Sequence, residues 1–324
     1  MKNVGLILAW MVVATVVTAA EPLLEGYGMR FKPATTNIQW AITNELRPSL
    51  WTYRRTGEAF SGAMISNIVA VCGFSWGERT NAAVRPRDKK LFYFKRGDGE
   101  RHYLGIHGPL GRVEFLDENA HTVDLDSSGV PDDQEARAKA LAILEKIGIF
   151  QSELARDSLT GRVLVTRLFS EVSGRNKRTG EMDQRVNSRS VYVLRSLDGV
   201  NFSGYGTDGG AEITFGNEGK LHEVKILWLP LTRLKEEKVA PPDEILRRIR
   251  DGKGFMSPGP LSDVIYWQPG LQKLIINRVR LFYHGRQDED ENPPEIVYPF
   301  AALDVTARYA NTNLNTVLNV PVLK

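Results

Sequence analysis

One serine lies in a five-residue pattern that serine hydrolases use for their nucleophile. Residues 73–77 read GFSWG, which matches G-x-S-x-G and makes Ser75 the candidate nucleophile. This elbow needs a strand before the serine, a helix after it, and Asp and His partners further along the chain. An apolar run precedes Ser75, but residues 78–87 make a poor packed helix. The pattern therefore predicts either a serine hydrolase or a turn leaving a helix, with Phe74 and Trp76 packed on the core.

A second pattern has the oxygen spacing of a calcium-binding loop. Its members occupy positions 1, 3, 5 and 12 of a twelve-residue loop, with glycine at position 6: Asp124, Asp126, Ser128, Glu135 and Gly129. Carboxylate and hydroxyl oxygens at this spacing can surround a hard cation. However, Asp124 ends a strand-like stretch, and Pro131 stands where a β-branched residue or leucine is usual. The loop predicts either a calcium site or a Ser/Gly turn that leads into the acidic first turn of a helix.

The other reactive residue types do not form a recognised constellation. Residues 204–209 match G-x-G-x-x-G but lead into the strand-like residues 211–215, whereas a dinucleotide site needs a helix there. His222 begins a metalloprotease-like pattern, yet Ile226 stands where its second histidine would be. A single cysteine, Cys72, excludes an internal disulfide and a Cys-based zinc cluster, and its apolar neighbours predict a buried, inert thiol. We expect no cofactor, apart from calcium if the second pattern is a site.

The first twenty residues have the layout of a secretory signal peptide. Lys2 precedes an apolar run over residues 4–17, and small residues follow before Glu21. We expect export to the periplasm or the extracellular space without a membrane span after cleavage; an uncleaved N-terminal anchor is the alternative. The 324 residues are 42% hydrophobic and 25% charged, with a net charge of +3. This composition excludes a disordered or polytopic membrane protein and provides no case for nucleic-acid binding.

The elements expected to position these residues fall into two α+β units after the signal peptide (residues 1–20). The N-terminal unit covers residues 21–125, with a helix that Ser61 caps. The C-terminal unit covers residues 126–324 and opens with a helix over 131–148, which has an acidic first turn and an apolar stripe. Meandering antiparallel strands follow, with a further helix after Pro242. The aromatic residues of the later strands are expected in the core: Trp228, Tyr266, Trp267, Phe282 and Tyr283.

Residues 131–305 carry a pattern of strands and turns that resembles known families. After the helix come three segments: VYVLRSLDGVNFSG at 191–204, ITFGNEGKL at 213–221 and LWLPL at 227–231. This looks like PepSY-like domains, like propeptides of secreted metalloproteases and like the YycI/YycH-type exported regulatory proteins. The resemblance implies a cystatin-like fold, in which a helix lies across an antiparallel sheet, and an inhibitory, chaperone-like or regulatory role. It assigns no binding residue, and the chain has no protease domain attached.

From these patterns we expect an α+β protein of two tandem units, each a helix packed on an antiparallel sheet. A non-enzymatic function is favoured over an enzymatic one, through contact with another exported or envelope protein. Sheet edges can provide that contact by β-augmentation. Two alternatives stay open: an exported serine hydrolase that uses Ser75, and a calcium-stabilised binding module that uses the loop from Asp124 to Glu135. The partner and the oligomeric state do not follow from the sequence.

Overall fold

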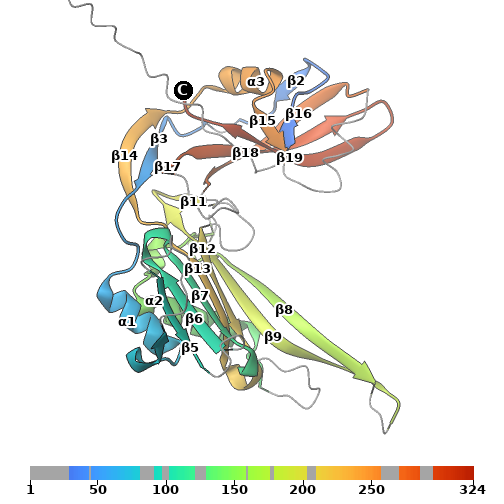
Figure 1. Cartoon of the computed structure of the whole chain (residues 1–324). Helices are drawn as coiled ribbons and strands as arrows, with labels where there is room; N and C mark the ends of the chain where they lie inside the picture. Colours follow the sequence, from blue (N-terminus) through green and yellow to red (C-terminus); the bar gives the residue numbers. More distant parts are fainter. Residues whose placement is uncertain are drawn as a thin grey trace, which may run out of the picture.

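The chain is built mainly from β-strands. The structure is a computed structural model that describes the following residues: 29–43, 45–80, 91–96, 102–120, 129–157, 160–175, 179–202, 209–256, 270–284 and 295–324. These residues form three α-helices and nineteen strands, which are arranged in two eight-stranded sheets and one three-stranded sheet. Figure 1 shows two bodies, each built on one of the large sheets, with a curved ribbon of strands running between them.

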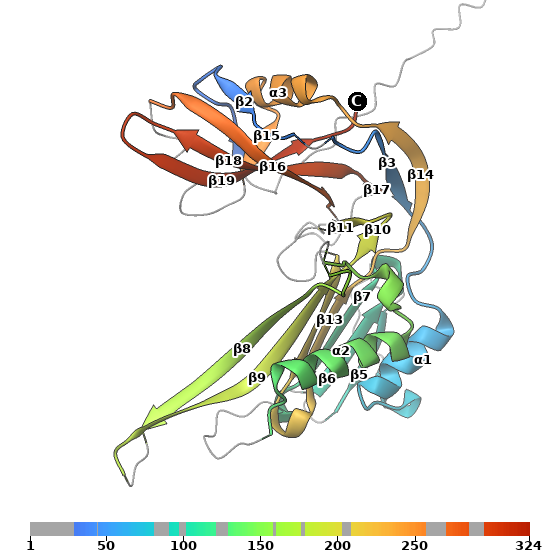
Figure 2. The ribbon, with the colours of Figure 1, turned by 180° about the vertical axis from the view of Figure 1, so that it is seen from behind.

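The first sheet is antiparallel and has the order β4-β5-β6-β7-β13-β12-β9-β8. Its strands, in chain order, are β4 (Arg79–Thr80), β5 (Leu91–Lys95), β6 (His102–His107), β7 (Arg112–Asp117), β8 (Val165–Arg175), β9 (Met182–Leu194), β12 (Gly210–Phe215) and β13 (Leu221–Leu227). Two helices, α1 (Gly62–Val71) and α2 (Asp133–Ile147), cover one face of this sheet (Figure 2). Their buried side chains form one core with the inward-facing residues of the strands.

Both helices begin at a side-chain cap: Ser61 caps α1 as predicted, and α2 begins at Asp133, two residues later than predicted, because Asp132 is its cap. The Ser61 hydroxyl accepts the Met64 N–H, and the Asp132 carboxylate accepts two N–H groups in the first turn of α2. At the other end of α2, Gly148 has φ +100°, a conformation that favours glycine, and it ends the helix. The predicted helix over 131–148 is therefore confirmed as α2.

The second sheet has the order β1-β15-β19-β18-β16-β11-β10, and β2 also pairs with β16. Its strands, in chain order, are β1 (Met29–Phe31), β2 (Ile38–Trp40), β10 (Ser196–Leu197), β11 (Val200–Phe202), β15 (Gly254–Met256), β16 (Lys273–Tyr283), β18 (Pro299–Arg308) and β19 (Asn313–Pro321). Helix α3 (Pro242–Arg250) buries its apolar side in the core of this sheet. The curved ribbon between the two bodies is the three-stranded sheet, formed by β14 (Leu231–Lys238), β3 (Ser49–Arg55) and β17 (Ile296–Val297) (Figure 1).

A polar cluster ties this ribbon to the turn between β10 and β11. Asp198 in that turn accepts hydrogen bonds from the Tyr53 hydroxyl of β3 and from the Arg233 guanidinium of β14. Burial and the bond to Asp198 raise the pKa of Tyr53 to about 12. Nearby, the buried Arg195 donates to the Leu229 carbonyl at 2.6 Å and lies over the Trp228 ring. These contacts link the end of the first sheet to the ribbon and the second sheet.

The expectation of two tandem units, each a helix packed on an antiparallel sheet, is wrong. The chain is mostly β, and α1 and α2 share one sheet. That sheet combines β4 to β7 with strands that come after α2, because β7 pairs with β13 and places Glu114 opposite Lys225. Turn residues specify local hairpins, but they do not specify which distant strands pair. The core positions of Trp228, Phe282 and Tyr283 are confirmed, and Tyr266 and Trp267 lie outside the described residues.

Candidate functional site

Ser75 lies between a helix and a strand, in the reverse order to that of a nucleophile elbow. Helix α1 ends at Val71, and Ser75 then precedes a 3-10 turn over Trp76–Glu78, which leads directly into β4. The elbow needs a strand first and a helix second, so that the serine stands at the top of a parallel sheet. Here the sheet is antiparallel, and Phe74 is buried against it. This placement matches the predicted turn that leaves the first helix, but only Phe74 is in the core, because Trp76 is 47% exposed.

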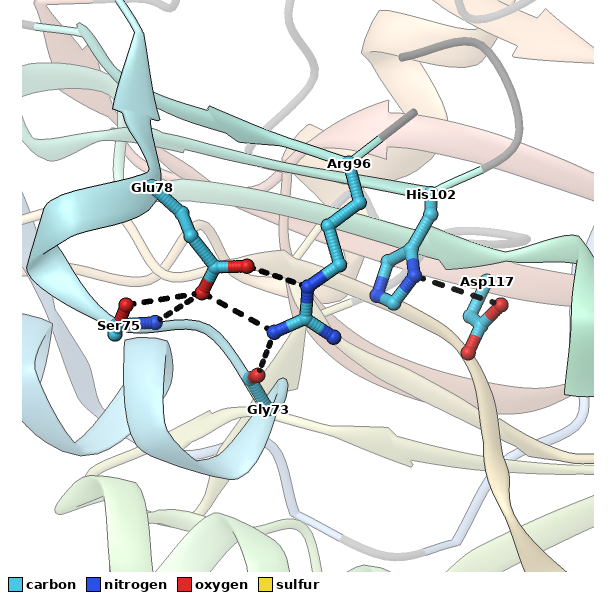
Figure 3. A network of polar contacts seen from close by, with 6 residues as sticks. All are labelled: Gly73, Ser75, Glu78, Arg96, His102 and Asp117. Atoms are coloured by element: carbon cyan, nitrogen blue, oxygen red, sulfur yellow. Dashed lines mark hydrogen bonds and ion pairs between the residues drawn. The ribbon is translucent and has the colours of Figure 1, made fainter. Parts of the chain in front are cut away.

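The polar partner of Ser75 is a carboxylate that an arginine holds (Figure 3). The Ser75 N–H and hydroxyl donate to Glu78 Oε2 at 2.8 and 3.0 Å. Arg96 donates to both oxygens of Glu78 and also to the Gly73 carbonyl. The Arg96 hydrogen bond, followed by the Ser75 N–H, lowers the pKa of Glu78 to about 2. A carboxylate with this pKa is a weak base at neutral pH, and the network closes the turn between α1 and β4.

His102 and Asp117 form a neighbouring pair that faces away from Ser75. Arg96 lies between Ser75 and His102 in Figure 3, and His102 Nδ1 is 3.9 Å from Asp117 Oδ1. The His102 ring packs edge-on against Phe74, with the ring centroids 5.0 Å apart. General-base activation of a serine requires an imidazole within about 2.6–3.2 Å, or one water away. The structure thus pairs Ser75 with the Glu78 carboxylate, which Arg96 holds, and not with His102.

The predicted calcium ligands are only partly described. Asp124, Asp126 and Ser128 lie outside the described residues. Glu135 occupies the first turn of α2 and forms an ion pair with Lys139 at 2.8 Å. Within the described part of the chain, no three His, Cys, Asp or Glu side chains gather closely enough to hold a metal ion. The calcium hypothesis therefore stays a prediction.

Two further expectations for individual residues are confirmed. Cys72 is a buried free thiol in the core of the first sheet, and burial raises its pKa. After the glycine-rich residues 204–209, of which only Gly209 is described, the chain enters β12 and not a helix. A dinucleotide phosphate would therefore find no helix N-terminus there. The predicted signal peptide lies outside the described residues; among the helices that the structure describes, none is long and apolar enough to cross a membrane.

The sequence predicts a strand at 163–172, a basic hairpin tip and a strand at 190–194, but not the length of the hairpin of β8 and β9. This hairpin runs far beyond the rest of the first sheet in both views (Figures 1 and 2). Two contacts anchor its base: Arg189 of β9 donates to Asp133 in α2 and to the Pro131 carbonyl. At the level of this anchor, Phe169 lies opposite Arg189 and Leu168 opposite Ser190, and 59% and 52% of their surfaces are exposed; Met182, near the tip, is 70% exposed. Exposed apolar side chains on both faces of a ribbon indicate that it stands clear of the core.

A sequence signal for this hairpin does exist. Residues 165–194 contain six Lys or Arg and three Asp or Glu, which makes a formal charge of +3. The whole chain also has a net charge of +3, so the remaining residues sum to zero. Arg175, Lys177 and Arg178 therefore belong to a longer positive segment. The two strands of the hairpin have 11 and 13 residues, which exceeds the usual length. Summing the formal charge over successive 30-residue stretches of the sequence shows that this segment is positive.

The comparisons with known proteins provide no identity. No family model matches the chain, and no curated protein matches it. Among solved structures, the chain is similar to the crystal structure of an uncharacterized protein from Eubacterium rectale ATCC 33656, with 7% sequence identity and a TM-score of 0.44. That similarity covers 84% of this chain and 82% of the other. The resemblance to PepSY-like and YycI/YycH-type proteins stays a prediction.

Proposed function

We propose that this is an exported, non-enzymatic protein that binds an extended segment of another protein along the free edge of β8. One observation carries the proposal: β8 is eleven residues long, it is the last strand of its sheet, and it exposes the large apolar side chains of Leu168 and Phe169. Among the described residues, no strand pairs with its outer edge. Proteins normally shorten, charge or cover such an edge, because it is a template for pairing with another chain. Strand addition uses this template for binding.

The hydrogen-bond register shows which backbone groups face outward. The Arg195 N–H donates to the Gly209 carbonyl, on the side of β9 that faces β12. The Leu194 carbonyl accepts the Ala155 N–H on the opposite side, which faces β8. Backbone groups alternate along a strand, so even-numbered residues in this part of β9 face β8. The pairing of Phe169 with Arg189 then turns the Phe169 N–H and carbonyl away from β9. Phe169 combines an exposed aromatic side chain with backbone groups available to an added strand.

The charge of the hairpin indicates the chemistry of the partner. Its formal charge of +3 favours an acidic segment, both in the rate of encounter and in the choice of partner. Among the described residues, Arg189 is engaged with Asp133 at the base, but it also lies 5.9 Å from the Phe169 ring. The proposed ligand is therefore an extended peptide with alternating acidic and apolar residues. Its backbone would pair with β8, and its apolar side chains would cover Leu168 or Phe169.

A proline substitution tests this mode of binding directly. Phe169→Pro removes the outward N–H and leaves the bonds to β9 in place, because proline is tolerated at such positions of edge strands. Phe169→Ala is the matched control, because it removes the same ring and keeps the N–H. The probe is a ten-residue synthetic peptide that alternates valine and glutamate, and its affinity is measured by fluorescence anisotropy. We expect Phe169→Pro to bind about tenfold more weakly than Phe169→Ala.

Several outcomes would contradict the proposal. Equal affinities of the two variants would show that the β8 backbone is not used. Equal binding of a valine–lysine peptide would show that the site does not prefer acidic segments. Failure of both peptides to bind would show that β8 is not a peptide site. Binding to phosphatidylserine vesicles alone would replace the protein partner with a membrane surface. Hydrogen exchange provides an independent readout, because the Phe169 amide should exchange more slowly when the peptide is bound.

A further inference from the structure

The second sheet has an interrupted edge. On the side away from β18, β16 pairs in parallel with β2 over Leu274–Ile276 and with β11 at Phe282 and Tyr283. Between these two strands, residues 277–281 have no strand partner on that side within the described part of the chain. A gap of five residues corresponds to about 16 Å of extended chain. The edge is thus open in its middle and closed by a strand at each end.

A cavity of about 540 Å³ occupies this interruption. Its apolar wall is formed by Ile42, Leu46, Val200, Val279 and Leu281. A volume of this size falls within the range of small-ligand sites, about 300–1,000 Å³. The cavity therefore offers a mixed polar and apolar surface and a free strand edge to one small ligand.

The backbone of β16 presents hydrogen-bonding groups to this cavity. Leu274 N–H donates to the Asn37 carbonyl and the Ile276 carbonyl accepts from Ala41, so these two residues face β2. Asn277 forms a bulge in the pairing with β18, and the alternation continues beyond it with the opposite parity. Val279 and Leu281 consequently turn backbone groups toward the gap. An extended peptide backbone can satisfy these groups, whereas an alkyl chain cannot.

The charged groups of the cavity favour an anionic end on the ligand. Arg47 and Arg278 line it together with one acidic residue, Glu45. Arg47 is engaged, since it donates to the Asp198 carbonyl at 2.7 Å. Arg278 is exposed, and its guanidinium makes no hydrogen bond or ion pair with the described residues. A guanidinium in this state matches the fork geometry of a carboxylate.

We propose that this cavity binds the C-terminal end of a short extended peptide. The peptide backbone would pair with Val279 and Leu281, an apolar side chain would lie against Ile42 and Leu46, and the terminal carboxylate would meet Arg278. A chain end fits better than an internal segment, because β2 and β11 close the two ends of the slot. This site lies on the second sheet and is independent of the β8 edge, which belongs to the first.

Equilibrium dialysis of the full chain tests this proposal with defined probes. A randomised pool of acetylated tetrapeptides with a free carboxylate is compared with the same pool carrying a C-terminal amide, and the retained peptides are quantified by mass spectrometry. We expect about tenfold more retention of the free-acid pool, and loss of this difference in Arg278→Gln. Arg280→Gln is the matched control: Arg280 lies two residues away on the same strand, bonds to Asp304 and does not line the cavity.

Each other outcome overturns the proposal. If the two pools were retained equally, or if neither were retained, the protein would not recognise the terminal carboxylate. An unchanged Arg278→Gln variant would place any binding elsewhere on the protein. Decanoate that displaces the retained peptides completely would show that the strand edge is not used. Phe169→Pro should retain the free-acid pool as the unsubstituted protein does, so failure at this site and failure at β8 are separate results.

Discussion

The two edges of the first sheet differ in how they meet solvent. At one edge, β4 is two residues long, and the turn before it is closed by Arg96 and Glu78. Arg79 of β4 lies over the Phe92 ring at 4.7 Å. At the other edge, β8 is eleven residues long, and Leu168 and Phe169 are more than half exposed.

This difference shows what an edge needs if it is to stay unpaired. The β4 edge has features that usually protect an edge strand from pairing with another chain: it is short, it carries a charged side chain, and a local turn closes it. The β8 edge also carries charged residues, but it is long and it exposes Leu168 and Phe169, which promote pairing. These features indicate that the β4 edge stabilises the fold, whereas the proposed function assigns binding to the β8 edge. The following experiments test that division, beginning with the largest expected effect.

Truncation of one aromatic residue at each edge should separate them most strongly. Phe94 is fully buried, and it packs against Phe74 and Trp76 next to β4. Phe94→Ala should lower the free energy of unfolding by about 3–5 kcal/mol, because it removes a core ring and leaves a cavity. Phe169→Ala should change it by no more than about 0.5 kcal/mol. Urea unfolding measures both variants, and equal losses would mean that the hairpin is part of the core.

Thiol reactivity should report the same contrast without unfolding the protein. Cys72 is buried beneath the β4 side of the sheet, and its raised pKa disfavours the thiolate. A thiol introduced by Met182→Cys lies on the exposed hairpin and should react with a disulfide reagent at least about a hundredfold faster. Denaturant should remove the difference. Similar rates in the folded protein would show that the β4 side opens readily.

The ion pair at the β4 edge should give a defined pH dependence. Glu78 has a pKa of about 2 in the folded chain, below its ordinary value of 4.5. A lowered pKa contributes stability that is present above pH 4.5 and is lost as the pH falls through 2. At neutral pH the melting midpoint of Glu78→Gln should therefore be lower than that of the unsubstituted protein. In acid the two midpoints should converge. Arg96→Gln should show the same convergence. If its midpoint differed from that of the unsubstituted protein by the same amount at every pH, Arg96 would not be the cause of the lowered Glu78 pKa.

Ser75 should give the smallest effect. Ser75→Ala removes one hydroxyl bond to Glu78, so the melting midpoint should fall by only about 1–3 °C. A fluorophosphonate probe should label the unsubstituted protein no more than it labels this variant. Specific labelling of Ser75 would reinstate the serine hydrolase hypothesis and would give the β4 edge a catalytic role.

Some of this structure could be predicted from neighbouring residues alone. Asp132 and Gly148 mark the ends of α2, because a helix cap forms with residues only a few positions away. The turn interpretation for Ser75 also rested on nearby residues, since Glu78 is three positions along. Arg96 could not be assigned to this turn from the sequence. It directly follows β5, and only the pairing of β5 with β4 places it beside Glu78.

The sequence by itself determined the helices, the local turns, the buried cysteine and the concentration of positive charge in residues 165–194. Tertiary structure alone decided that β7 pairs with β13, that β8 ends its sheet, and that β16 is left open between β2 and β11. The physical reason is that caps and turns depend on side chains close in sequence. Strand pairing uses backbone groups that every residue carries, so the choice of partner depends on how all the cores pack together.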